Sequence, residues 1–509
     1  MKKFFPGAFS KPSEKTVISE LRKSLRHKAA SMLSLLIGVS FIGGCSISGT
    51  DPFPKVAQPT ESASVSSSPA VTTGSELPTE TTSSGMPVLR VAAPITNDTA
   101  QYLLKLYTAK QKGILGEGVD GSNVSLQVLD SVKPDFSVEI LQTPSSGVMD
   151  DTLKRWGESE IYPDIVLSAS LSSLCASGSV IPLTDYLASN PLLVPTDVYR
   201  PMLEALSIDG ELYGIPYSAS AKILFANRDV LLKAGINTVP FEMDLTSFLS
   251  FSESVSNLNS ETTLLPDRLF AFYEPSELLP FLPSSYSESA DWFMFNGSAF
   301  EFNAGSFRKA VQFLRSYVSA GYSVESLTPE QRTEAYATLD PRLSGNVAMW
   351  VGSTEDISLW TNTAFTVSIS QLPSENKEKE AALPLTVYPL SITSSCTNPQ
   401  LAADFAAFIA LDTDAILLTV RLEGSDGMLP VVTNDGVWEA MVEKQTFGGN
   451  LMLLKDKMND AYFDPVTNND LANRQILKML SDYRASLMDE TQDFDTLVRA
   501  LSTAGLQNS

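Results

Sequence analysis

The sequence has almost no histidine and very little cysteine. Its 509 residues include one histidine, His27, and three cysteines. His27 lies in a basic N-terminal segment that is typical of a secretory signal peptide, so the mature protein would contain no histidine. Ser-His-Asp and Cys-His catalysis as usually built, and zinc sites with a histidine ligand, are therefore excluded. The composition weakens the case for an enzyme before any fold is considered.

The apolar run near the N-terminus is too short for a comfortable membrane span. It covers residues 32–44, MLSLLIGVSFIGG, whereas a spanning helix needs roughly 20 apolar residues. It ends in Ile42, Gly43 and Gly44 directly before Cys45. This ending resembles the bacterial lipobox, in which the cysteine is diacylated and becomes the mature N-terminus, and two acyl chains anchor stably. The alternative is a plain signal peptide followed by an incidental cysteine.

The other two cysteines are Cys175 and Cys396. If Cys45 is lipidated, they can form at most one disulfide. They are 221 positions apart, and the sequence does not say whether they meet. Two buried thiols are the alternative.

Positive charge is scarce. Lys and Arg number 36 against 59 Asp and Glu, which gives a formal charge of −23. Removing residues 1–44 takes away eight basic and two acidic residues and lowers this charge to −29. So acidic a body argues against nucleic acid as a partner and against broad contact with an anionic membrane surface. Residues 46–87 are dominated by Ser, Thr and Pro, a composition typical of a disordered tether.

The remaining chain has the pattern of an α/β protein. Apolar strands are expected at residues 88–93, 136–140 and 163–167, with helices after Asn97 and over residues 150–156, which predicts a mainly parallel sheet. Further downstream we expect a helix at residues 302–321, strands at 347–351 and 385–391, and a helical tail at 468–506. Residues 399–422 are nearly apolar but are interrupted by Asp404, Asp412 and Asp414. They therefore predict a packed helix or helix pair and not a membrane span.

Seven short motifs follow one another in a recognisable order. They are YPDIV (162–166), ASGSVIPLTDY (176–186), DGELYGIP (209–216), LFANRDVLLKAGI (224–236), GNVAM (345–349), the helix that begins NP (398–409) and GMLP (427–430). Each is weak alone, but seven in one order are highly specific, and the resemblance that they carry covers about residues 88–505. In this order they resemble the family 1 extracellular solute-binding proteins of ABC importers, the group that contains maltose- and oligosaccharide-binding proteins.

The resemblance implies an α/β, two-lobed, periplasmic-binding-protein-like fold of type II. Following a signal peptide (1–44) and the lipidated cysteine with its tether (45–87), the first lobe would take residues 88–216 and 390–428. The second lobe would take residues 217–389 and 429–509. The chain would cross between lobes near residues 216–217, 388–389 and 429–430, and ligand-coupled hinge closure would be the mechanism.

The resemblance, with the rule that such sites lie at strand ends and at the hinge, selects a set of ligand-binding candidates. In the first lobe they are Asn97, Asp98, Ser168 and Ser170, and at the hinge Tyr217, Ser218 and Ser220. In the second lobe they are Glu274, Ser276, Ser353 and Glu355. Several have simpler explanations: Asn97 and Asp98 as helix caps, Ser168 and Ser170 as strand ends, and Tyr213 and Trp350 as core residues.

The chain departs from the sugar-binding pattern at two places. Relatives that bind sugars often carry an aromatic ring where this chain has Ser168, and a tryptophan in the turn where it has Glu355. Either Trp292, Tyr217 or Trp360 substitutes as a stacking platform, or the solute is not a typical oligosaccharide and is polar or cationic.

Three functions remain open. The first is a monomeric, lipid-anchored protein on the outer face of the cell membrane that captures a small solute, with a saccharide favoured, for an ABC transporter permease, without a cofactor or metal. The second is a binding protein that senses its ligand and docks to a membrane receptor. The third is a surface glycoside hydrolase that uses two carboxylates, although no such pair stands out.

Overall fold

The structure is a computed structural model of the whole chain. It describes residues 86–142, 149–168, 170–193, 197–287, 294–295, 300–376, 383–425, 427–464, 484–486, 488–489 and 491–507. The predicted signal peptide, Cys45 and nearly all of the predicted tether lie outside these residues. None of the helices in the described ranges is both long enough and apolar enough to cross a membrane.

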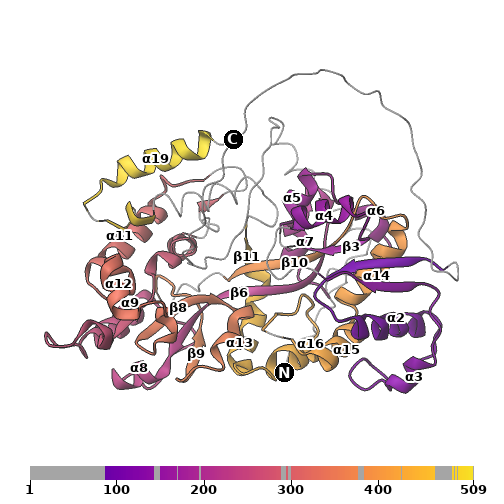
Figure 1. Cartoon of the computed structure of the whole chain (residues 1–509), viewed down its shortest axis with the longest axis horizontal. Helices are drawn as coiled ribbons and strands as arrows, with labels where there is room; N and C mark the ends of the chain where they lie inside the picture. Colours follow the sequence, from indigo (N-terminus) through magenta and orange to yellow (C-terminus); the bar gives the residue numbers. More distant parts are fainter. Residues whose placement is uncertain are drawn as a thin grey trace, which may run out of the picture.

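A nine-stranded sheet runs through the whole molecule, in the order β2-β1-β3-β10-β6-β8-β7 with β11 added to β10 and β9 added to β6 (Figure 1). Its strands are β1 (Val88–Ala92), β2 (Ser137–Ile140), β3 (Ile165–Leu167), β6 (Ile215–Asn227), β7 (Phe270–Phe272), β8 (Val347–Ser353), β9 (Val367–Ser370), β10 (Pro384–Ile392) and β11 (Tyr462–Phe463). A separate hairpin joins β4 (Ser207–Ile208) to β5 (Glu211–Leu212).

The sheet is mixed, so the expectation of a mainly parallel sheet was wrong in the middle of the molecule. The outer pairs β1–β2, β1–β3 and β7–β8 are parallel. The central strands β10 and β6 pair antiparallel with each other, and β10 also pairs antiparallel with β3 and β6 with β8. Helical crossovers predict parallel neighbours, but strands that pass between two lobes are joined by other connections and are not bound by that rule.

Strand β6 belongs to both halves of the sheet. Its first part pairs with β10, from Ile215 to Ala221, and its last part pairs with β8 and β9, from Lys222 to Asn227. The middle of the strand, Ser218 to Ala221, consists of small side chains that are all buried. A single continuous strand therefore joins the two halves, and small residues let neighbouring elements approach it closely where it passes between them.

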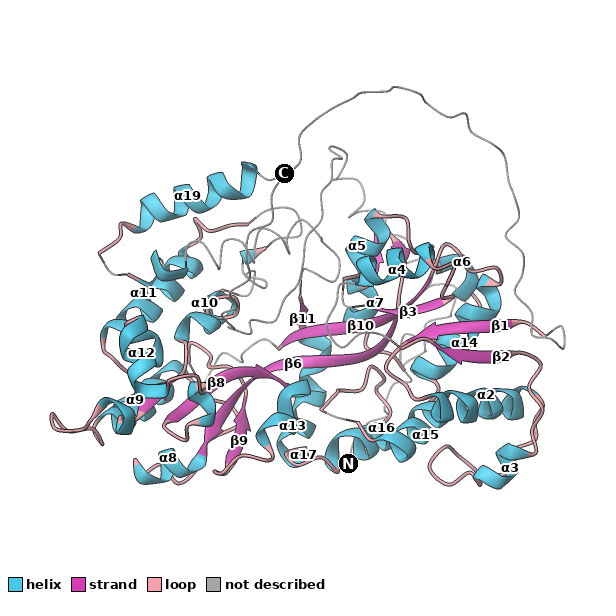
Figure 2. Cartoon of the chain, in the orientation of Figure 1, coloured by secondary structure: helices cyan, strands magenta, loops and turns pink. Residues whose placement is uncertain are grey.

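Helices lie on both faces of the sheet (Figure 2). The helices that precede the tail are α2 (Asn97–Gln111), α3 (Leu126–Asp130), α4 (Met149–Glu158), α5 (Leu171–Ala176), α6 (Thr184–Leu187), α7 (Arg200–Ala205), α8 (Arg228–Lys233), α9 (Leu245–Ser256), α10 (Leu282–Tyr286), α11 (Gly305–Ser319), α12 (Pro329–Tyr336), α13 (Ile357–Trp360), α14 (Pro399–Leu411), α15 (Thr413–Glu423), α16 (Asp435–Trp438) and α17 (Gly448–Leu451). The last is α19 (Phe494–Gln507), and the rest of the predicted helical tail lies largely outside the described residues.

Short 3-10 and π segments complete the described chain: η1 (Leu265–Asp267), η2 (Pro275–Leu278), η4 (Val324–Ser326), η5 (Pro341–Leu343), η6 (Thr354–Asp356), η7 (Glu439–Glu443) and η8 (Met452–Asp460). The Asp209-Gly210 turn between β4 and β5 has both residues at positive φ, 53° and 86°. This is the hairpin turn that the sequence predicted.

The buried hydrophobic side chains form two clusters, of which the larger extends through both halves and the smaller lies in the second lobe. One gathers side chains such as Val91, Ile165 and Phe405, and Tyr107 meets Phe405 edge to face at 5.7 Å. The other includes Phe248 and Phe272, whose ring centroids are 5.3 Å apart. The α/β, two-lobed architecture predicted from the sequence is confirmed.

The apolar segment at residues 399–422 is a helix pair, as predicted. Helix α14 ends at Leu411, and Asp412 begins α15 because its side chain accepts hydrogen bonds from the backbone of Asp414 and Ala415. Asp412 and Asp414 also form ion pairs with Lys110, both at 2.6–2.7 Å. Asp412 is thus a helix cap, and Asp412 and Asp414 together anchor the helix pair to α2.

The chain that follows Leu429 contacts the first lobe before it reaches β11. Val432 pairs with Val198 in an isolated bridge, and the Trp438 ring meets Tyr199 edge to face at 6.3 Å. Segment η8 reaches the other half as well, since Lys457 pairs with Glu242 at 3.1 Å. Strand β11 then joins the sheet beside β10.

Cys175 and Cys396 are both free and half-buried. Burial raises the pKa of each thiol to about 12. At neutral pH both side chains are therefore protonated and weakly reactive.

Candidate functional site

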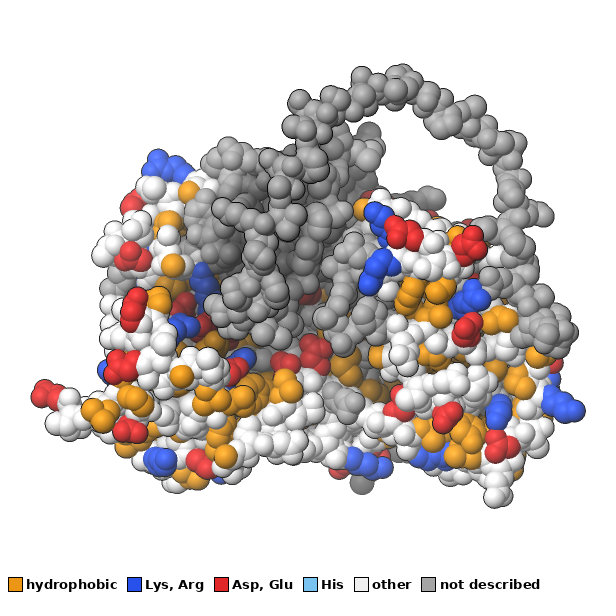
Figure 3. Space-filling view, in the orientation of Figure 1, with side chains coloured by type: hydrophobic (Ala, Val, Ile, Leu, Met, Phe, Trp, Pro, Cys, Tyr) orange, Lys and Arg blue, Asp and Glu red, His pale blue; other side chains and the backbone are white. Residues whose placement is uncertain are grey.

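The ends of the strands in the second lobe point toward the hinge strand β6. Because β7 and β8 are parallel, the residues that follow them leave the sheet at the same edge. Glu274 follows β7 closely, Ser353 is the last residue of β8, and Thr354 to Asp356 follow it. This edge faces the strands that pass between the lobes, where Figure 3 shows acidic and hydrophobic side chains next to each other.

Four side chains form what we call the hinge cluster: Ser220 of β6, Tyr388 of β10, Ser353 at the end of β8 and Glu355 in the turn after it. The hydroxyl of Tyr388 donates to Glu355 Oε2 at 2.7 Å. The Ser220 hydroxyl lies 3.3 Å from that of Thr354, which in turn accepts from the Ala221 backbone at 3.2 Å. Lys222 donates to the Ser353 hydroxyl at 2.6 Å. The cluster therefore ties both hinge strands, β6 and β10, to the turn after β8.

Burial and charge together shape this cluster. Burial raises the pKa of Tyr388, and the neighbouring Glu355 carboxylate raises it further. The phenol therefore stays protonated and acts as a hydrogen-bond donor at any physiological pH. Glu355 itself is exposed, so the pair combines a fixed donor with a carboxylate that solvent or a solute can reach.

A second group, the Arg–Glu cluster, consists of Glu274, Glu325, Arg332 and Arg484. Glu274 pairs with Arg332 at 2.7 Å and also with Arg484, and Arg484 pairs with Glu325 at 3.2 Å. The two arginines lower the pKa of Glu274 against the opposing effect of burial. The predicted site residue Ser276 is part of the same network, because its backbone donates to Glu325 at 3.0 Å and its hydroxyl contacts Arg484.

Glu277 lies beside this cluster but differs from Glu274 in its protonation. Its Oε2 atom is shielded from solvent and has no hydrogen-bond partner among the described residues. Burial, and then the charge of Glu274, raise the pKa of Glu277 to about 8. A carboxyl group in such surroundings is protonated at neutral pH.

The predicted residues of the first lobe make local contacts. Ser168 is buried, and its hydroxyl accepts from the Ser170 backbone at 3.1 Å. Asn97 and Asp98 are exposed in the first turn of α2. The side chain that caps this helix is Thr96 and not Asn97 or Asp98, because it accepts from the Thr99 backbone. The expectation that Asn97 and Asp98 cap the helix was therefore displaced by one residue.

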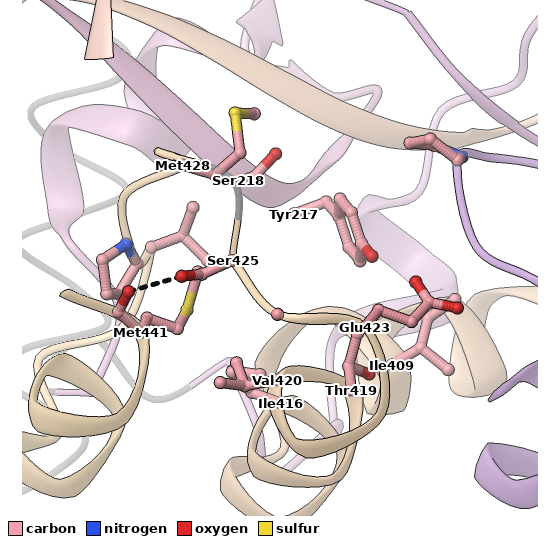
Figure 4. Close-up of a pocket in the computed structure, with 14 residues that line it drawn as sticks. Tyr217, Ser218, Ile409, Ile416, Thr419, Val420, Glu423, Ser425, Met428 and Met441 are labelled. Atoms are coloured by element: carbon pink, nitrogen blue, oxygen red, sulfur yellow. Dashed lines mark hydrogen bonds between the residues drawn. The ribbon is translucent and has the colours of Figure 1, made fainter. Parts of the chain in front are cut away.

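Beside β6 lies a cavity of about 290 Å³, the hinge pocket. It is lined by Pro94, Tyr217, Ser218, Ile409, Ile416, Thr419, Val420, Glu423, Gly424, Ser425, Met428, Pro430, Val431 and Met441. Figure 4 shows Tyr217 and Glu423 at one side, and the Ser218 hydroxyl turned away from both. The alternation along β6 therefore separates Tyr217 from Ser218 and Ser220.

The candidate stacking rings are mostly used in the core. Trp350 is fully buried and stacks on Phe225 at 6.0 Å. Trp360 is buried against both, with its ring 4.7 Å from Trp350, so it offers no open face. Trp292 lies outside the described residues. Tyr217 is the ring among these candidates that reaches a cavity.

The sequence did not identify three residues of these sites: Tyr388, Glu423 and Arg484. Tyr388 could have been found as the residue opposite Ser218 once the pairing of β10 with β6 was known. Glu423 and Arg484 carry no sequence signal, because their roles depend on contacts over 159 to 327 positions. Within the described residues, no group of three or more Asp, Glu, Cys or His side chains is placed to hold a metal ion.

The two lobes share one sheet, in which strand β6 runs from one lobe to the other. The family model described as bacterial extracellular solute-binding protein matches residues 133–441. The chain therefore belongs to this family. A search of curated protein sequences found no match.

Solved structures with the same fold include several sugar-binding proteins. The cyclic alpha-maltosyl-1,6-maltose binding protein from Arthrobacter globiformis has a TM-score of 0.62 at 18% identity, over 83% of this chain and 99% of that one. The sugar-binding protein MalE from Xanthomonas citri has a TM-score of 0.59 at 15% identity, over 83% and 97%. An ABC substrate-binding protein from Listeria monocytogenes in complex with cycloalternan has a TM-score of 0.58 at 14% identity, over 82% and 97%. At these identities the likeness establishes the fold.

Proposed function

We propose that the protein captures a saccharide between its lobes at the outer face of the membrane and delivers it to an ABC transporter permease by hinge closure. The observation that carries the proposal is the hinge cluster. It places hydroxyl and carboxylate groups from both hinge strands and from the second lobe at one point. Such groups satisfy sugar hydroxyls, and a solute bound there would bridge the elements that move.

The proposed binding site consists of the residues selected from the sequence: Asn97, Asp98, Ser168, Ser170, Tyr217, Ser218, Ser220, Glu274, Ser276, Ser353 and Glu355. Structural relatives whose names include maltose, cycloalternan and maltotetraose support a saccharide as the solute. No catalytic role is proposed, and the protein would act as a monomer.

The proposed lobes take residues 88–216 with 390–428 and residues 217–389 with 429–509. The contacts of Val432 and Trp438 with the first lobe favour a refinement, in which the third passage between lobes is β11 and not residues 429–430. The proposed membrane attachment is a lipid on Cys45 followed by the tether. Incorporation of labelled palmitate that disappears in Cys45→Ser would support this attachment, and equal labelling of both forms would contradict it.

Calorimetric titration with maltotetraose and a panel of linear and cyclic glucosaccharides tests the solute proposal, with X-ray scattering to detect lobe closure. We expect at least one saccharide to bind with a smaller radius of gyration in the complex. Glu355→Gln should weaken that binding at least tenfold, about 1.4 kcal/mol. The matched control is Glu439→Gln, which removes an exposed carboxylate that contributes to neither the hinge cluster nor the lining of the hinge pocket. Absence of binding across the panel, or equal losses in the two variants, would contradict the proposal.

A further inference from the structure

The hinge pocket has a strongly asymmetric lining. One wall is aliphatic or thioether, formed by Ile409, Ile416, Val420, Met428, Val431 and Met441. The polar groups are few, and two of them are used within the protein. Thr419 donates to the Ala415 carbonyl at 2.9 Å, and Ser425 donates to the Met441 carbonyl at 2.6 Å (Figure 4). The polar character of the cavity is therefore concentrated at Tyr217 and Glu423.

Glu423 is only half satisfied. Its Oε1 accepts from the Thr96 backbone at 2.8 Å and from the Thr96 hydroxyl at 2.6 Å. No described residue donates to Oε2, and no Lys, Arg or His is among the residues that line the cavity. In Figure 4 one carboxylate oxygen of Glu423 and the hydroxyl of Tyr217 are turned toward the same part of the cavity. The Tyr217 hydroxyl likewise has no hydrogen-bond partner among the described residues.

A carboxylate oxygen beside an apolar cavity creates a site for one kind of ligand. The half-buried carboxylate of Glu423 attracts an opposite charge, and the apolar surroundings strengthen that attraction. The half-buried ring of Tyr217 offers a face to the same charge. The aliphatic wall would bury the apolar part of the ligand, which is favourable because it removes that surface from water. A neutral sugar fits this pocket poorly, because its hydroxyl groups would lie against the aliphatic wall.

We propose that the hinge pocket binds a small organic ammonium ion with an alkyl body, with its charge at Glu423 and Tyr217 and its carbon chain against Val420 and Met441. This site is distinct from the hinge cluster, because none of Ser220, Ser353, Glu355 and Tyr388 lines the pocket. A cavity of about 290 Å³ holds an alkylammonium of about five carbons.

Calorimetric titration of the intact protein with three five-carbon probes tests this proposal: n-pentylammonium, 1-pentanol and pentanoate. We expect the ammonium to bind at least tenfold more tightly than the alcohol, and pentanoate not to bind. Glu423→Gln, which keeps an oxygen for Thr96, should weaken pentylammonium binding at least tenfold. Glu439→Gln, on an exposed residue outside the pocket, should leave that binding within twofold.

A second variant guards against disturbance of the Thr96 contact. Val420→Phe fills the apolar wall and keeps Glu423, so it should also abolish pentylammonium binding. Equal binding of the amine and the alcohol, no binding of the amine, or unchanged binding in both variants would overturn the proposal. If the unaltered protein binds a saccharide but no amine, the ammonium proposal for the hinge pocket is wrong and the saccharide proposal stands. Amine binding without saccharide binding contradicts the saccharide proposal alone.

Discussion

The two lobes hold their polar side chains in different ways. On the first-lobe side, Ser168 makes a local hydrogen bond with Ser170, and Asn97 and Asp98 are exposed at a helix start. On the second-lobe side, Glu274 is fixed by Arg332 and Arg484, which come from distant parts of the chain. The second-lobe groups are therefore positioned before any solute arrives, whereas the first-lobe groups are exposed or bonded locally. Preorganised groups lose less entropy on binding, so we expect specificity to depend mainly on the second lobe.

The largest expected effect comes from removing the centre of the Arg–Glu cluster. Glu274→Ala leaves two arginines without their shared carboxylate and should lower the free energy of unfolding by about 3 kcal/mol. The control is Glu204→Ala, whose pair with Arg200 is more than half exposed on both sides, and which should cause no measurable change. Urea unfolding measures both. Similar losses in the two variants would mean that the second lobe is not held by this cluster.

The contact between the two sides can be tested at Gly427. This residue has φ +79°, and a Cβ atom there would lie 2.1 Å from the Thr354 carbonyl oxygen. Gly424 has φ +88° with nothing near its Cβ position. Gly424→Ala should cost about 1 kcal/mol from the backbone alone, and Gly427→Ala about 2 kcal/mol more from the clash. Thermal unfolding measures both variants. If Gly424→Ala and Gly427→Ala lower the stability equally, Gly427 is not in close contact with Thr354 in the turn after β8.

Because Glu277 of the second lobe is protonated in the folded protein, we expect the free energy of unfolding to depend on pH. Its pKa is about 8 in the folded protein against an ordinary value of 4.5. Between these values the folded protein holds a proton that the unfolded chain has released, so the free energy of unfolding falls as pH rises from about 5 to about 8. Glu277→Gln should remove this slope and should stabilise the protein by roughly 1–2 kcal/mol at pH 8. The measurement is the free energy of unfolding of the unaltered protein and of Glu277→Gln across this pH range. If the two plots against pH run parallel, Glu277 is not the group that causes the slope.

The smallest effect is expected at the hydrogen bond between the hinge and the second lobe. Tyr388→Phe removes the donor to Glu355 and should cost about 1 kcal/mol. The control is Tyr213→Phe, whose half-buried hydroxyl has no hydrogen-bond partner among the described residues. Unfolding free energies that change equally in both variants would show that Glu355 is not held by Tyr388.

The sequence predicted local structure well and long-range partners poorly. The Asp209-Gly210 turn, the α14–α15 pair and most strands were predicted, because Gly, Pro, Asp and apolar periodicity act over a few residues. The antiparallel pairing of β10 with β6 joins residues more than 160 positions apart, and no local pattern encodes it. The same limit explains why Glu274 could be selected from its local sequence as a site candidate while its partner Arg484 was not foreseen.

The position of β10 has a consequence for how the chain acquires its structure. This strand, at residues 384–392, lies between β3 and β6, which end at residues 167 and 227. The sheet of the first lobe therefore lacks a middle strand until some 390 residues have been synthesised. Contacts this distant in sequence delay folding. A chain that is to be threaded through an export channel from its N-terminus would gain from this order, because its first lobe cannot close early.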